Sequence, residues 1–134
     1  MKIERLEMTH YAADGRTSSV ERFEHPSWDT IERELCSMHR FSKPIMGLYQ
    51  LQDVNDNQCM LINGGEDIYH MTVWDDISMM IYFDESRGDE EVEVWTSDQG
   101  FTTTAEDTCD TKRALKIVRW YCDHGKPHPY YLWD

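Results

Sequence analysis

The feature that most restricts the fold is a succession of short apolar segments between Pro44 and Asp110. Clusters of Asp, Asn and Gly separate these segments and indicate turns, so each segment is a predicted strand. The predicted strands are Ile45 to Leu51, Cys59 to Ile62, Ile68 to Trp74, Ser78 to Phe83 and Val92 to Trp95. Because they follow one another in a run, we expect an antiparallel meander.

Two segments with helical periodicity flank this run of strands. Ser27 precedes apolar residues at spacings of three and four, which predicts a capped helix that ends before Pro44. Asp110 caps a second predicted helix, which Gly125 and then Pro127 bring to an end. Strands grouped between two helices indicate an α+β domain, with an antiparallel sheet of about six strands and two helices packed on one face.

Further strands are expected near the ends of the chain. The segment from Arg5 to Ala12 alternates, and the Asp14-Gly15 turn signal predicts an edge hairpin that returns from Ser18 to Phe23. Aromatic residues before Trp133 indicate a short last strand that packs this Trp in the core. We expect all 134 residues to form one domain.

Several classes of protein are excluded by composition. No apolar run approaches the ~20 residues of a membrane span, and the first residues lack the apolar core of a signal peptide. A cytoplasmic protein is therefore expected. The four cysteines include no C-x-x-C pair, so in this reducing compartment they are predicted to be small buried hydrophobic residues.

Negative charge is concentrated in the middle of the chain. Residues 71–110 contain twelve acidic residues and one basic residue, a net charge of −11 in a chain of net charge −13. This segment repels phosphates, so nucleic acids and anionic membranes are not expected partners. It attracts basic proteins, and Trp74, Tyr82 and Trp95 supply the aromatic anchors typical of interfaces. The alternative is that the acids only keep the domain soluble.

The length of the turn after Trp74 decides which side chains of the next strand point away from the core. A three-residue loop directs Met79 and Ile81 to the core and Tyr82 outward. A two-residue Asp75-Asp76 loop would reverse these directions, but it lacks the Gly that tight turns favour, so the longer loop is preferred. The predicted partner-binding surface is the outer sheet face with its loops, namely Trp74, Asp75, Asp76, Tyr82, Asp84, Glu85, Asp89, Glu90, Glu91, Glu93 and Trp95.

No catalytic residues are predicted. The chain lacks a G-x-S-x-G motif, and Gly64-Gly65 reads as a single turn rather than a phosphate-binding loop. Paired loop carboxylates such as Glu90-Glu91 are expected to be solvated, whereas catalytic carboxylates are usually sheltered. Cys122, His124 and His128 have zinc-ligand character but no fourth ligand, so no metal or cofactor is predicted.

Several short motifs follow one another in a defined order between Ser27 and Trp133, which is about four fifths of the chain. They are Pro26-Ser27-Trp28 with Ile31, the strand pair from Leu61-Ile62-Asn63-Gly64-Gly65 to Tyr69, Gly88, the helix from Thr111 to Asp123, Gly125-x-Pro127 and Trp133. In order and spacing they resemble the Imm-one family of immunity proteins from bacterial polymorphic toxin systems.

This resemblance implies a small non-enzymatic protein that binds and inhibits a cognate toxin domain, often a nucleic-acid deaminase or nuclease. Such a toxin needs a basic substrate groove, which an acidic protein with aromatic anchors can cover. The alternative is a small enzyme or ligand-binding domain that uses the outer sheet face and a histidine. A toxin gene directly upstream would favour the first interpretation, and metabolic neighbours the second.

Overall fold

The computed structural model describes residues 1–51, 58–95 and 100–134. The helices in these ranges are α1 (Trp28–Cys36) and α2 (Thr111–His124), with the short 3-10 helices η1 (Glu85–Arg87) and η2 (Ala105–Asp107). The strands are β1 (Arg5–Tyr11), β2 (Ser18–Glu24), β3 (Ile45–Tyr49), β4 (Cys59–Gly65), β5 (Ile68–Trp74), β6 (Met79–Phe83), β7 (Glu91–Trp95), β8 (Gly100–Thr104) and β9 (Leu132–Trp133).

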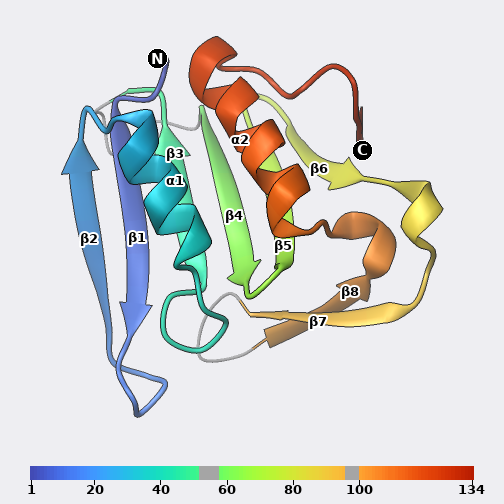
Figure 1. Ribbon diagram of the computed structural model, residues 1–134, viewed down its shortest axis with the longest axis horizontal. Helices are drawn as coiled ribbons and strands as arrows, with labels where there is room; N and C mark the ends of the chain where they lie inside the picture. The colour runs from blue at the N-terminus through green and yellow to red at the C-terminus, as the bar shows by residue number, and fades with distance from the viewer. Residues whose placement is uncertain (52–57, 96–99) are drawn as a thin grey trace.

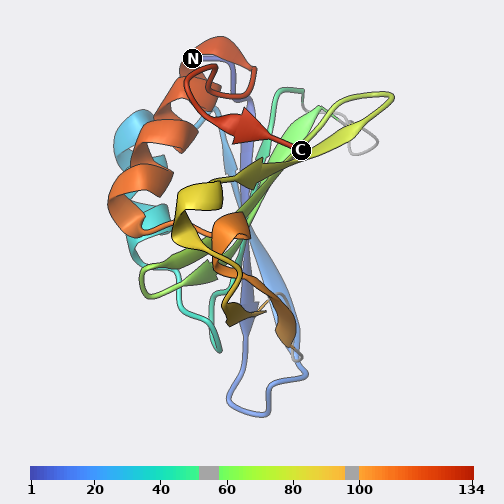
Figure 2. The same cartoon turned by 90° about the vertical axis from the view of Figure 1, so that its right-hand side faces the viewer.

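One antiparallel sheet of seven strands dominates the molecule, in the order β2-β1-β3-β4-β5-β6-β9 (Figure 1). Both helices lie on the same face of this sheet (Figure 2). The predicted α+β fold, with two helices on one face of an antiparallel sheet, is therefore confirmed. The β1–β2 hairpin forms the predicted edge, since β2 pairs with β1 alone among the described strands.

The placement of the strand around Val92–Trp95 in the main sheet is wrong. This strand, β7, instead pairs with β8 in a separate two-stranded ribbon. Competition for an edge explains the difference. At the edge of β6, Tyr82 pairs with Trp133 and Phe83 with Leu132, so β9 occupies the position that β7 was expected to take.

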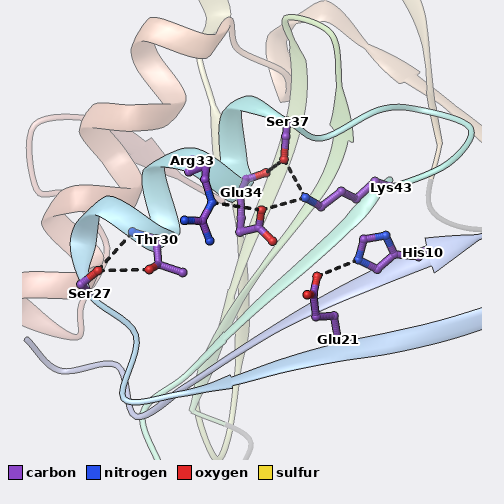
Figure 3. Close-up of polar contacts among 8 residues, drawn as sticks. All are labelled: His10, Glu21, Ser27, Thr30, Arg33, Glu34, Ser37 and Lys43. Carbon is purple, nitrogen blue, oxygen red and sulfur yellow. Dashed lines mark hydrogen bonds and ion pairs between the residues drawn. The ribbon is translucent and has the colours of Figure 1, made fainter.

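The first helix begins where the sequence predicts. Ser27 Oγ accepts a hydrogen bond from the Thr30 N–H at 3.2 Å (Figure 3), which satisfies one unpaired amide of the first turn. The helix ends at Cys36, earlier than Pro44 suggested. Glu34 faces inward and its Oε2 lies 2.9 Å from Lys43 Nζ (Figure 3), an ion pair that joins the helix to the segment before β3.

The predicted caps of α2 are confirmed at both ends. Asp110 accepts a hydrogen bond from the Arg113 N–H at 2.8 Å, and Gly125 ends the helix with a φ of 69°. Asp67, in the β4–β5 turn, accepts a second bond from the Thr111 N–H at 2.8 Å. This bond and another from the Thr111 hydroxyl, at 3.0 Å, hold the pKa of the Asp67 carboxyl below its usual range.

The interpretation of Gly64-Gly65 as a turn is wrong. Both glycines belong to the end of β4, and the turn itself consists of Glu66 and Asp67, with φ values of 54° and 74°. The glycine at position 65 is instead required by packing. A Cβ added there would lie 2.6 Å from the backbone carbonyl of Met38, so only glycine allows this close approach.

The core fills the space between the sheet and the helices. From the sheet it includes Leu6, Met8, Met46, Leu48, Met60, Ile62, Tyr69, Met71, Val73 and Tyr82, and from the helices Ile31, Leu35, Ala114, Ile117, Val118, Tyr121 and Cys122. Trp133 packs against this cluster, with its ring 5.9 Å from that of Tyr82 in an edge-on arrangement. The predicted packing role of Trp133 is therefore confirmed.

The turn after Trp74 has the opposite parity to the one preferred from the sequence. Trp74 pairs with Met79, so an even number of residues, four, separates the paired strand ends. Tyr82 consequently faces the core and is fully buried, with 0% of its surface exposed. Its assignment as an outward anchor is wrong. Met79, expected in the core, faces outward with Trp74.

Candidate partner-binding surface

The β5–β6 hairpin projects beyond the body of the molecule at the upper end of the sheet (Figure 2). We define the hairpin tip as Trp74, Asp75, Asp76, Ile77, Ser78 and Met79. Ile77 is 94% exposed, Met79 43% and Trp74 39%. An apolar side chain as exposed as Ile77 adds little to the stability of the fold. Grouped exposed apolar side chains commonly mark an interaction site.

The conformation of the tip depends on Asp75. Its Oδ1 accepts hydrogen bonds from the Ile77 N–H at 2.9 Å and the Ser78 N–H at 2.7 Å. These bonds stabilise the turn although it contains no glycine, the residue that tight turns favour. They also lower the pKa of the Asp75 carboxyl. The neighbouring carboxylate, Asp76, accepts a longer bond at 3.4 Å from Gln58 Nε2. Asp75 therefore shapes the tip, while Asp76 presents charge.

Trp74 continues into a row of side chains on the outer sheet face, the face opposite the helices. Its indole Nε1–H donates to Thr72 Oγ1 at 3.2 Å, which orients the ring. The cross-strand register aligns Trp74 with Cys59, Cys59 with Tyr49, and Tyr49 with Arg5. The Arg5 guanidinium lies 4.2 Å from the centre of the Tyr49 ring. Sequence reasoning missed Ile77, Met79 and Tyr49 because their outward direction follows from the register.

The remaining predicted acids do not join the tip. β7, which carries Glu91 and Glu93, crosses the opposite end of the sheet from the β5–β6 turn (Figure 1). Asp84 has a structural role, because it caps η1 and lies 3.6 Å from Arg113. The exposed acids of this second region, which we call the η1–β7 region, are Glu85, Asp89, Glu90, Glu91 and Glu93. The predicted single surface is therefore divided into two.

The anchor predicted at Trp95 lies partly outside the described residues. Its backbone belongs to β7 and pairs with Gly100, but its side chain is not described. The neighbouring Val94 is buried at 1% exposure. The position of Trp95 in the interface therefore stays a prediction.

The β7–β8 ribbon covers part of the outer face. The Phe101 ring of β8 meets the His70 ring of β5 edge-on, with 5.2 Å between centroids. His70 is 7% exposed, and this burial lowers the pKa of its imidazole. Among the described residues, His70 Nδ1 has no hydrogen-bond partner. The ribbon therefore closes one end of the outer face, while Trp74 and Met79 remain exposed at the other.

The three residues considered as zinc ligands lie in different environments. Cys122 is buried in the core, where desolvation raises the pKa of its thiol to about 12. His124 and His128 lie against the Trp120 ring, with centroid distances of 3.8 and 4.7 Å. Over the described ranges, no three potential ligands converge on a metal-sized site.

No protein-family model matches this chain, and no curated protein matches it significantly. Neither helix of the described structure has the length and apolar character that crossing a membrane requires.

Proposed function

We propose that this protein is an immunity protein that binds a cognate toxin domain in the bacterial cytoplasm and blocks its basic active-site groove. The toxin is a nucleic-acid deaminase or nuclease. The observation that supports this proposal is the hairpin tip, where three exposed apolar side chains stand beside two carboxylates on a projecting hairpin. No cofactor and no catalytic residue is needed for such inhibition.

The tip has the two components that a protein interface requires. Full burial of an apolar side chain such as Ile77 contributes about 1.5–3 kcal/mol, and the free protein leaves this contribution unused. Asp76 supplies a charge that a basic residue of the groove can pair with. The acids of the η1–β7 region add long-range attraction, which accelerates encounter with a basic partner.

The direct test uses the C-terminal domain encoded by the gene immediately upstream. Co-expression with this protein should protect cells, and Ile77→Ala should weaken both protection and binding measured by calorimetry. Val20→Ala is the matched control, because Val20 is also an exposed β-branched residue but lies on the distant edge strand β2. Equal effects of the two substitutions would contradict a role for the tip.

One observation favours the alternative of a ligand-binding domain. His70 is buried on the outer face with an unpartnered Nδ1 among the described residues, and such a group can meet a ligand. A His70→Gln protein should still bind and protect if the immunity proposal is right. Loss of the cellular function in a folded His70→Gln protein that keeps its toxin affinity would instead support the alternative.

A further inference from the structure

A pocket of about 350 Å³ lies beside the hairpin tip, between the β5–β6 hairpin and the C-terminal end of α2. Its apolar lining comes from Val73, Trp74, Met80 and Pro127, and its positive charge from Lys2 and Lys126. This volume and this mixture of apolar walls with a few polar groups are typical of sites that receive a ligand group.

The two lysines of this pocket outnumber its single carboxylate. Neither Lys2 nor Lys126 forms an ion pair with a residue in the described part of the chain, although other bases are paired, as Lys43 is with Glu34. Asp75 also lines the pocket, and its carboxylate stays charged while it accepts hydrogen bonds from the amides of its own turn, so the pocket combines two ammonium groups with one carboxylate. In a chain of net charge −13, an acidic domain therefore presents a local site for an anion.

The chemistry of the pocket selects a carboxylate attached to an apolar body. Lysine ammonium groups form charge-assisted hydrogen bonds with carboxylates, and Val73 and Met80 can cover the attached carbon atoms. The pocket adjoins the tip, because Trp74 and Asp75 belong to both. A partner seated on the tip therefore reaches the pocket with the same surface.

We propose that this pocket receives an acidic side chain of the toxin domain, next to the bases that pair with Asp76. This inference rests on the proposed function and extends it, since the interface then alternates in charge. It also reverses a simple expectation. If general attraction between an acidic protein and a basic groove were the whole explanation, removing a lysine would strengthen binding. If the pocket receives a carboxylate, removing the lysine weakens binding.

The test compares Lys126→Gln and Lys126→Glu with Lys116→Glu, using the toxin domain encoded immediately upstream. Lys116 lies on the exposed side of α2 and does not line this pocket. We expect Lys126→Glu to weaken binding about tenfold through faster dissociation, Lys126→Gln less so, and Lys116→Glu to leave the affinity unchanged. If the Glu variant does not fold, Lys126→Gln alone shows whether removal of the lysine weakens or strengthens binding. Unchanged or tighter binding of the folded Lys126 variants would overturn the inference.

A wild-type protein that does not bind this domain would refute the proposed function, and the pocket is then tested with a small probe. N-acetylphenylalanine carries a carboxylate on an apolar body, and its amide analogue serves as the control. We expect saturable NMR shifts of the Met80 methyl group and the Lys126 amide with the acid only, absent in Lys126→Glu. The lack of saturable shifts would overturn the pocket assignment.

Discussion

The hairpin tip and the η1–β7 region each combine one tryptophan with acids, but they expose different kinds of side chain. In the tip, the apolar side chains of Trp74, Ile77 and Met79 face solvent. In the η1–β7 region and its ribbon, Val94 is buried and Phe101 packs on His70, so solvent meets mainly carboxylates.

This difference indicates two separate roles in binding. Affinity comes mainly from a few buried anchors, and of these two regions it is the tip whose described side chains include such anchors. Exposed acids act over a Debye length of about 8 Å at physiological salt and mainly affect the association rate. We therefore expect the tip to control dissociation of the toxin complex and the η1–β7 region to control its formation.

The largest effect is expected at Tyr82, which the structure removes from the interface. Tyr82 is fully buried and its hydroxyl accepts a hydrogen bond from Arg113 Nη1 at 2.8 Å. Tyr82→Ala should lower the free energy of unfolding by about 3–5 kcal/mol, measured by urea denaturation. Tyr130→Ala, at an exposed position, should change it by less than about 0.5 kcal/mol. A Tyr82→Ala protein with wild-type stability would contradict the core role of Tyr82 and support its earlier assignment to the interface.

The next effect is expected at Trp74, as an anchor of the tip. Trp74→Ala should reduce toxin affinity by about 2 kcal/mol or more, mainly through faster dissociation measured by surface plasmon resonance. Leu132→Ala is the control, because Leu132 is also exposed but lies on β9, away from the tip. A Trp74→Ala protein with wild-type dissociation would show that the tip is not the anchor.

A smaller, kinetic effect is expected from the η1–β7 region. Combined Glu85→Lys, Glu90→Lys and Glu91→Lys substitutions should slow association roughly tenfold at low salt, with little change in dissociation. Raising the salt concentration should slow association of the wild-type protein and reduce the difference. A change confined to dissociation would place these acids in direct contact with the toxin and end the distinction between the two regions.

The smallest effect concerns pH and the attachment of the β7–β8 ribbon. Burial lowers the pKa of His70 below the ordinary 6.5, so the unfolded chain binds this proton more readily than the folded protein. Stability from neutral His70 is therefore present above pH 6.5 and is lost as pH falls below this value. Amide exchange of β7 and β8 should accelerate more between pH 7.5 and 5.5, after correction for intrinsic rates, than in His70→Gln. Equal acceleration would exclude His70 as the cause.

Local signals in the sequence predicted three of the four α-helix ends and most strands. A cap requires only residues within one turn, as at Ser27, Asp110 and Gly125, so neighbouring sequence contains the necessary information. Asp75 and Asp76 were likewise assigned to an exposed turn. The early end of α1 was missed because Glu34, His39 and Arg40 take partners distant in sequence, including Glu66.

By itself, the sequence determined the α+β class, the caps and the concentration of acids. These properties depend on contacts within a few residues. Only the tertiary structure decided the parity of β6, because Trp133 and Arg113, much later in the chain, pack on and bond the inward-facing Tyr82. Only the tertiary structure separated β7 from the main sheet, because β9, much later in the chain, occupies the edge of β6. These two features define the candidate surface. The parity of β6 directs Tyr82 inward and Met79 outward, and the separation of β7 divides the acids between two regions.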